Sequence, residues 1–264
     1  MSCLLPRAGS RCRLRHSNLD RECTIRTVLG AWMFMPELLK MDRKELLSLL
    51  VRAIVSRKAE GRPLKVAIDG RSAAGKSTLA DELGALISAL DFHVLCPSVD
   101  GFHHPRERRY PRGEFSAQGY YDCAYNYEEV VDTLLKPLSG DTFPVLCRQI
   151  SIDLRTDLPT YPPSVSVSAR TILLFEGIFV FRKELNPYWD YRILLDVDPA
   201  TALLRGLARD TIRPPDVIRR RYERRYDPAW EIHLKTERPE SKADVIVDNR
   251  DVSRPRILKP MCCA

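Results

Sequence analysis

The chain has 264 residues, of which 44% are hydrophobic and 29% are charged, as expected of a globular protein with one sizeable core. No apolar run reaches the length of about 18 residues that a membrane-spanning helix needs, so no membrane partner is expected. The formal net charge is +7, but residues 1–40 hold six Arg and one Lys against three acidic residues. The remainder is therefore nearly balanced and requires no nucleic-acid surface.

The first 35 residues differ in character from the rest of the chain. They are rich in Arg, show no sustained helical or strand period, and lack the apolar core of a secretory signal. Asp20 and Glu22 argue against a transit peptide. We predict a disordered extension, or sequence translated upstream of a start at Met35 or Met41, followed by one domain over residues 36–264.

Eight cysteines are present, and none forms a C-x-x-C pair, so their spacing gives little support for a zinc site. A chain of this size does not need disulfides as a scaffold. The cysteines are therefore interpreted as reduced thiols of a cytoplasmic protein.

Hydrophobic periodicity predicts helices and strands that alternate along the chain. Helices are expected over residues 37–58, 78–90, 128–138, 199–210 and 215–235. Strands are expected over residues 64–69, 92–97, 171–175, 191–197 and 243–247. Residues 101–127 are polar, aromatic and irregular. This alternation predicts an α/β fold in three layers, a five-stranded parallel sheet with helices on both faces.

The strongest motif lies between the first predicted strand and the helix after it. Residues 70–77 read Gly-Arg-Ser-Ala-Ala-Gly-Lys-Ser and match the phosphate-loop pattern G-x-x-x-x-G-K-[ST] in full. The glycines permit a close backbone approach that a Cβ would block, and the amides of the loop and helix N-terminus point at bound phosphates. The predicted nucleotide-binding residues here are Gly70, Ser72, Ala73, Ala74, Gly75, Lys76, Ser77 and Thr78.

Four side chains are assigned the chemistry of phosphoryl transfer from ATP. Lys76 can reach the β- and γ-phosphates, and the Ser77 hydroxyl can ligate Mg²⁺. Glu176 ends an apolar strand and is expected to be the second magnesium anchor. Asp100 follows the second strand, at the sheet edge where ligands bind, and is expected to accept the proton of a substrate hydroxyl. A turn role for Asp100 before Gly101 stays open.

Arginines after the fourth strand form a second set. Arg205 and Arg209 lie four apart on one predicted helix face, and Arg213 follows in a Pro-rich bend. Such groups stabilise charge on transferring phosphoryl oxygens, often from a closing lid, which is expected here near residues 205–225. The later arginines are interpreted instead as a solvated face or as salt-bridge partners: Arg219, Arg220, Arg221, Arg224 and Arg225.

Residues 103–127 are expected to carry acceptor specificity, because they lie between the candidate base and the next helix. Polar and aromatic side chains crowd this stretch: His103, His104, Arg106, Arg108, Arg109, Tyr110, Tyr120, Tyr121, Asp122 and Tyr125. Asp122 could accept hydrogen bonds from two sugar hydroxyls, or could be a turn residue. Adjacent histidines rarely face one point, so a metal site at His103 and His104 is not expected.

These elements, in this order, resemble the uridine kinase and phosphoribulokinase family of P-loop kinases over about residues 64–249. The resemblance is carried by residues 66–70, 99–102 (Val-Asp-Gly-Phe), 174–177 (Leu-Phe-Glu-Gly), 204–210 and 243–247. It implies a nucleoside-monophosphate-kinase-like sheet, Asp100 as the base, magnesium at Ser77 and Glu176, and lid arginines at Arg209 and Arg213. It also implies that Phe102, Tyr121 and Asp122 bind the substrate.

One part of the family pattern is missing. Uridine-cytidine kinases carry a Tyr and a His that help to read the pyrimidine, whereas residues 145–151, Val-Leu-Cys-Arg-Gln-Ile-Ser, contain neither. The sequence thus predicts an ATP- and Mg²⁺-dependent kinase for a small-molecule hydroxyl, a nucleoside first, with pantothenate, a sugar or phosphoribulose as alternatives. The sequence does not decide between ATP and GTP as the nucleotide, or between a monomer and a homo-oligomer.

Two alternatives to a kinase stay open. One is a P-loop ATPase or switch that acts on a protein partner, and the other is a protein that binds a nucleotide without catalysis. A GTPase would carry an Asn-Lys-x-Asp segment, and none is present. A transport ATPase would carry Leu-Ser-Gly-Gly-Gln, and residues 138–140 match only its first three positions.

Overall fold

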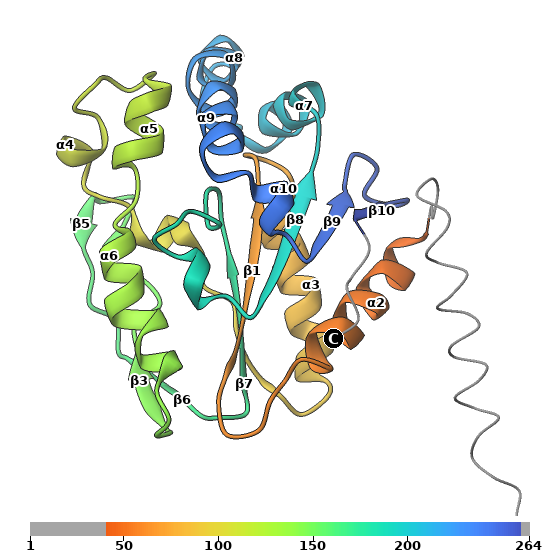
Figure 1. The fold of residues 1–264 in the computed structure, drawn as a ribbon. Coiled ribbons are helices and arrows are strands. Elements are labelled where there is room, and N and C mark those ends of the chain that lie inside the picture. The colour runs from red at the N-terminus through yellow and green to blue at the C-terminus, as the bar shows by residue number, and fades with distance from the viewer. Residues whose placement is uncertain (1–40, 260–264) are drawn as a thin grey trace, which may run out of the picture. The chain divides into compact units, whose positions relative to one another are not determined.

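The structure, a computed structural model, describes residues 41–259, so the predicted N-terminal extension lies outside the described residues. A six-stranded sheet in the order β10-β9-β8-β1-β7-β2 forms the centre (Figure 1). Its strands are β1 (Leu64–Gly70), β2 (His93–Leu95), β7 (Thr171–Glu176), β8 (Tyr191–Asp196), β9 (Val245–Asp248) and β10 (Arg256–Lys259). The first five run parallel, as predicted, and β10 runs antiparallel to β9. The short, half-polar β10 was not predicted, because an edge strand of four residues has almost no periodic signal.

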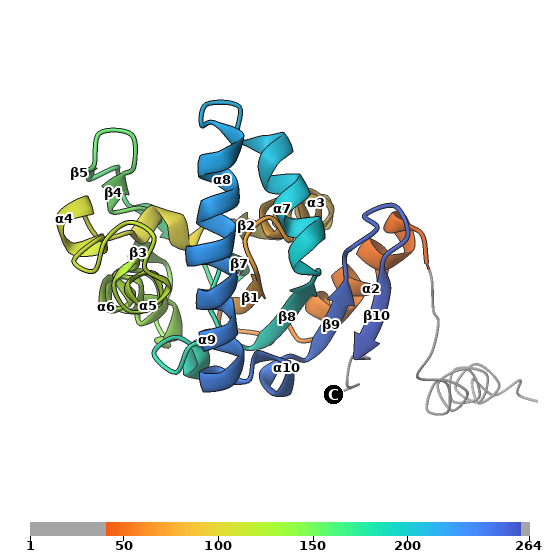
Figure 2. The ribbon, with the colours of Figure 1, turned by 90° about the horizontal axis from the view of Figure 1, so that it is seen from above.

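Helices cover both faces of the sheet, as predicted (Figures 1 and 2). The longer ones are α2 (Arg43–Val55), α3 (Lys76–Ser88), α5 (Ala117–Cys123), α7 (Pro199–Arg209), α8 (Pro215–Arg221) and α9 (Asp227–Glu237). Short helical pieces are η2 (Val99–Phe102), α4 (Arg106–Arg109), α6 (Tyr127–Val130), η3 (Val131–Leu135), η4 (Pro137–Ser139), η5 (Asn186–Tyr188), η6 (Tyr222–Tyr226) and α10 (Pro239–Lys242).

Side chains of the central strands alternate between two apolar clusters. All seven residues of β1 are buried; Val66 and Ile68 pack with the cluster that contains Leu50 of α2, whereas Ala67 packs with the cluster on the other face. A parallel strand that is buried on both faces needs apolar residues at successive positions. This explains why the strands read as continuous apolar runs in the sequence.

Two regions differ from the sequence prediction. Residues 101–127 are not irregular throughout, since they contain α4 and α5, and α5 packs against α9. The predicted helix over residues 215–235 is a run of α8, the π-helical segment η6 and α9. Two small antiparallel sheets were also not predicted: β3 (Val145–Cys147) with β6 (Val165–Val167), and β4 (Ile152–Asp153) with β5 (Leu158–Pro159).

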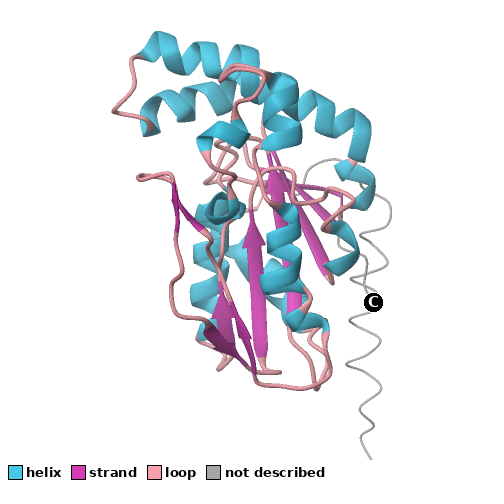
Figure 3. Cartoon of the chain, turned by 90° about the vertical axis from the view of Figure 1, so that its left-hand side faces the viewer, coloured by secondary structure: helices cyan, strands magenta, loops and turns pink. Residues whose placement is uncertain are grey.

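The carboxyl ends of the parallel strands meet at one end of the molecule, where α7, α8 and α9 lie (Figures 1 and 3). In open α/β sheets this edge is where ligands bind. It brings together the segments after β1, β2, β7 and β8.

Cys96, Cys123 and Cys147 are free thiols, and the other five cysteines lie outside the described residues. Within residues 41–259, no helix combines the length and the hydropathy that crossing a bilayer would require.

Candidate active site

The loop between β1 and α3 has the shape of a phosphate cradle. A Cβ on Gly70 would lie 2.7 Å from the backbone oxygen of Leu195, and one on Gly75 would lie 2.8 Å from Nδ2 of Asn249. Gly75 also has a φ of +95°, which other residues rarely adopt. Ser77 and Thr78 are exposed at the N-terminus of α3, where free amides attract anions.

Lys76, Ser77 and Glu176 lie together at this loop. The Lys76 ammonium donates to the backbone oxygen of Arg71 over 2.9 Å, and Ser77 Oγ donates to Glu176 Oε1 over 3.1 Å. Burial lowers the pKa of Lys76, and the carboxylates of Glu176, Asp69 and Asp100 act in the opposite direction. A hydroxyl beside a carboxylate is a donor set that suits Mg²⁺, which would take further ligands from phosphate and water.

Asp69, at the end of β1, was not predicted as a functional residue from the sequence. The feature that could have identified it is a single acidic side chain at the end of an apolar strand. It is fully buried. Its Oδ1 accepts from the amides of Gly70 (2.8 Å) and Phe179 (3.0 Å), and its Oδ2 accepts from the amide of Phe181 (2.9 Å). Nε2 of the buried His233 lies 3.0 Å from the same Oδ2. Asp69 therefore ties the start of the phosphate loop to α9.

Two further contacts hold the loop from elements far along the chain. Arg71 forms an ion pair of 3.0 Å with Asp227, the first residue of α9. Asn249, which follows β9, donates from Nδ2 to the backbone oxygen of Ala74 over 2.8 Å. Residues from the C-terminal half of the chain therefore hold the phosphate loop in place. The eight-residue loop motif alone does not predict these contacts.

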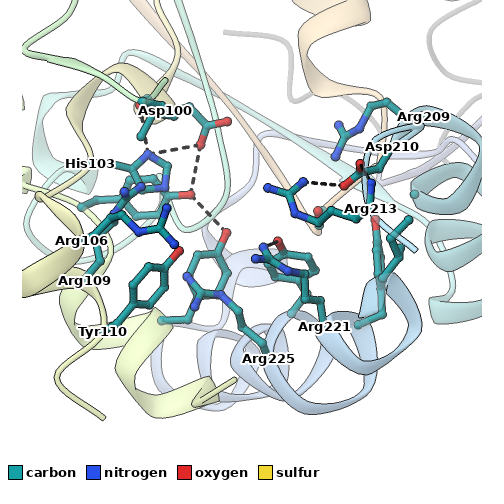
Figure 4. Close-up of a pocket in the computed structure, with 18 residues that line it drawn as sticks. Asp100, His103, Arg106, Arg109, Tyr110, Arg209, Asp210, Arg213, Arg221 and Arg225 are labelled. Carbon is teal, nitrogen blue, oxygen red and sulfur yellow. Dashed lines mark hydrogen bonds and ion pairs between the residues drawn. The ribbon is translucent and has the colours of Figure 1, made fainter. Parts of the chain in front are cut away.

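Asp100 lies in η2 with 63% of its side chain exposed. Its Oδ1 accepts from the Tyr125 hydroxyl over 3.2 Å, and the hydroxyls of Tyr120 and Tyr125 lie 3.2 Å apart. His103 Nδ1 is 2.9 Å from the Asp100 backbone oxygen (Figure 4). A Cβ on Gly177 would lie 2.2 Å from Val99, so Gly177 lets the end of β7 approach the Asp100 turn.

A pocket of about 360 Å³ opens at Asp100. Six arginines line it: Arg106, Arg109, Arg209, Arg213, Arg221 and Arg225. Arg209 and Arg213 lie on one side with Asp210, and Arg106 and Arg109 lie on the other side near Asp100 (Figure 4). The acceptor stretch contributes His103, Tyr110, Tyr120 and Tyr125, whereas His104, Arg108, Tyr121 and Asp122 do not line the pocket.

The interpretation of the later arginines as a solvated or salt-bridged face is correct only in part. Arg219, Arg220 and Arg224 are exposed, and Arg221 pairs with Glu114. Arg225, however, is only 3% exposed and faces the pocket, so for this residue the interpretation is wrong.

Two residues that were expected to bind ligands have structural contacts instead. Phe102 is fully buried, with its ring centroid 6.3 Å from that of Phe175. Arg205 donates from Nη2 to the backbone oxygens of Asn249 (2.7 Å) and Arg250 (3.1 Å) and does not line the pocket. Sequence spacing could not separate these roles, because both depend on segments distant in the chain.

The pair Tyr121 and Asp122 also lies outside the pocket. The guanidinium of Arg182 stacks 4.1 Å from the centroid of the Tyr121 ring. Asp122 accepts from Arg112 (3.2 Å) and from Gln118 (3.0 Å) on the exposed side of α5. In α5 it is the preceding Tyr120 whose side chain reaches the pocket.

The fold and the phosphate-loop motif place the chain among the P-loop proteins. No protein-family model matches the chain. A pantothenate kinase of Streptococcus agalactiae is 26% identical over 193 residues, which are 69% of this chain and 61% of that protein. Uridine-cytidine kinase 2-B of Danio rerio is 27% identical over 161 residues, which are 56% and 58% of the two chains.

A solved structure, described as a possible uridine kinase from Bacillus stearothermophilus, has a TM-score of 0.62 and 25% identity, and the match covers 77% of this chain and 97% of that one. The chain spans about six-tenths of the length of the curated relatives named above. These similarities support the resemblance to the P-loop kinases of the uridine kinase and phosphoribulokinase family.

Proposed function

We propose that the protein transfers the γ-phosphate of ATP to a hydroxyl group of a small molecule. The observation that carries this proposal is the meeting of a phosphate loop and an exposed carboxylate, Asp100, at one arginine-lined pocket. Hydrolysis of ATP would need only the loop and a water molecule. A pocket of this size beside the loop is what an acceptor molecule requires.

In the proposed reaction the acceptor oxygen forms a bond to the γ-phosphorus, and the bond from that phosphorus to the β–γ bridging oxygen breaks. Asp100 takes the hydroxyl proton, and the Tyr125 hydroxyl orients its carboxylate. Lys76, Arg209 and Arg213 neutralise charge on the phosphoryl oxygens. A magnesium ion held by Ser77 and Glu176 would supply further charge neutralisation at the phosphates.

The nucleotide is proposed to lie along the amides of residues 70–78, with residues 205–225 acting as a lid. The support for a lid is that Arg209, Arg213 and Arg221 reach the pocket from α7, the bend after it and α8. A lid that closes over the phosphates excludes water and so favours transfer over hydrolysis.

A nucleoside is the acceptor that the family resemblance suggests first. Tyr121 and Asp122, which would hold its ribose, lie outside the pocket. A pantothenate kinase is among the relatives, so an acceptor without a ribose is an equal candidate.

The test is to measure ADP release with magnesium-ATP and a panel of acceptors: uridine, cytidine, other nucleosides, pantothenate, ribulose 5-phosphate, simple sugars and no acceptor. We expect release that depends on one acceptor, with that compound phosphorylated in a ratio of one to one. Equal release in the acceptor-free sample would contradict a kinase and favour an ATPase or switch.

A further inference from the structure

Arg225 places a buried positive charge in the pocket without a carboxylate partner among residues 41–259. The residue is 3% exposed, and its guanidinium lies 4.3 Å from the ring centroid of Tyr120 and 4.9 Å from that of Tyr110. It donates to the backbone oxygen of Glu114, and its Nε has no hydrogen-bond partner in the described structure. A buried charge of this kind is costly unless an anion compensates it.

The neighbouring arginines leave this end of the pocket positive. Arg109 pairs with Asp157, and Arg221 pairs with Glu114, so each of these has one carboxylate. Arg106 is exposed, and no ion pair to its guanidinium occurs in the described part of the chain. Even when the Asp100 carboxylate is counted against Arg106, the charge of Arg225 remains in surplus, and aromatic faces can offset only a small part of it.

Arg225 is connected to the candidate base rather than to the phosphate loop. Its guanidinium stacks on Tyr120, whose hydroxyl meets that of Tyr125, which in turn donates to Asp100. Arg209 and Arg213, the arginines proposed for ATP, lie on the other side of the pocket (Figure 4). A molecule whose hydroxyl faces Asp100 would thus extend its far end toward Arg225.

We propose that Arg225, with Arg106 and Arg109, binds an anionic group of the acceptor while the acceptor hydroxyl faces Asp100. This inference rests on the proposed kinase function and narrows its substrate class to small hydroxyl compounds that carry a phosphate or a carboxylate. The planar guanidinium fork matches both groups through paired hydrogen bonds. Uncharged nucleosides would leave the Arg225 charge uncompensated.

The first experiment compares acceptors that differ only in the anionic group: ribose 5-phosphate with ribose, and pantothenate with pantothenol. The first pair tests a phosphate and the second pair tests a carboxylate.

Once an acceptor is found, Arg225→Met should raise the KM for that acceptor at least about 30-fold, with the KM for ATP within twofold of wild type. Arg224→Met removes the exposed neighbouring arginine and should leave both values unchanged.

Arg225→Lys is included in case Arg225→Met fails to fold. It keeps the positive charge but lacks the planar guanidinium that forms paired hydrogen bonds. It should bind the acceptor more weakly than wild type and better than Arg225→Met. Melting temperatures of all variants are measured alongside. An uncharged preferred acceptor, an unchanged acceptor KM in Arg225→Met, or a rise in the KM for ATP instead would overturn the proposal.

A binding experiment separates this inference from the proposed function. With the nucleotide site filled by a non-hydrolysable ATP analogue and Mg²⁺, inorganic phosphate or acetate is titrated by calorimetry into wild type, Arg225→Met and Arg224→Met. If wild type and Arg224→Met bind the anion and Arg225→Met does not, the anion site is supported, even if ADP release proves independent of acceptors. If neither anion binds wild type, the inference fails while a kinase for an uncharged acceptor stands.

Discussion

Lys76 and Asp100 reach the same sheet edge from different segments, and their surroundings differ. Lys76 is 9% exposed and is held by the Arg71 backbone oxygen, while nearby carboxylates counteract the lowering of its pKa by burial. Asp100 is open to the pocket, and Tyr125 holds one of its oxygens. A charge positioned for phosphate and a carboxylate open to an acceptor are the two local requirements of phosphotransfer.

Replacing Lys76 with methionine should reduce phosphotransfer at least about 100-fold, because the ammonium that would contact the phosphates is lost. Methionine has a similar length and needs no buried counter-charge, so the melting temperature should not fall. Steady-state kinetics and a thermal melt test this. Near-normal turnover would contradict the role of residues 70–77 as the phosphate loop.

Replacing Asp100 with asparagine should lower kcat by about 100-fold or more, the scale for a positioned base, and leave the KM for ATP within twofold. The amide keeps the shape of the side chain but cannot take the proton. Tyr125→Phe, which removes only the hydrogen bond to Asp100, should have a smaller effect. An unchanged kcat in Asp100→Asn would show that another group accepts the proton.

A close contact joins α7 to the helical segments that follow it. Gly206 in α7 faces Tyr222 of η6 so closely that a Cβ would lie 2.3 Å from the tyrosine hydroxyl and 2.5 Å from the ring. Both residues line the pocket. The approach of α7 to the run α8–η6–α9 therefore sets the position of the pocket wall.

Gly206→Ala should destabilise the protein by about 1–3 kcal/mol, although alanine normally favours a helix, because the Tyr222 ring must move. It should also raise the KM for ATP, since the displaced ring belongs to the proposed lid. Leu204→Ala, on the exposed face of the same helix, is the control and should have little effect. Denaturant unfolding measures the difference. Gly206→Ala should cost less in a Tyr222→Ala background, and an equal cost would exclude this contact as the cause.

At the scale of the whole molecule, we expect acid stability to depend on two histidines whose charged form is disfavoured by burial. The pKa of His104 is lowered to about 4 by burial, by the positive charge of Arg108 and by the charge that His103 carries when it is protonated. Burial likewise lowers the pKa of His103. The unfolded chain binds these protons near pH 6.5, so between pH 6.5 and about 4 it holds more protons than the folded chain. The free energy of unfolding therefore falls as the pH drops through this window.

His104→Gln should remove part of that fall, because glutamine does not titrate. Urea unfolding at pH 7, 5.5 and 4.5 should give a free energy of unfolding that declines less steeply for the variant than for wild type. Carboxylates contribute equally to both proteins, so the difference between the two slopes isolates His104. Parallel slopes would show that the environment of His104 does not disfavour its charged form.

The sequence predicted the parallel strands and the phosphate loop well, because both depend on residues close together in the chain. The pattern of residues Val66 to Asp69 predicts a strand without knowledge of the segments that pack on it, and the loop pattern is complete within eight consecutive residues. It did not predict β10, whose pairing with β9 requires the sheet to be present. It also did not predict that Asp69 would bind His233, 164 positions away.

The spacing of residues 70–77 and the acidic residues after the strands by themselves determined the class of protein, because backbone amides and neighbouring side chains make a phosphate site locally. Which side chains face the pocket was decided only by the tertiary structure. Arg224 and Arg225 are identical and adjacent, yet one is exposed and the other is buried, because η6 packs one side against α5. The same contact directs Tyr120 to the pocket and Asp122 away from it. Burial depends on the partner segment, and no local pattern encodes that partner.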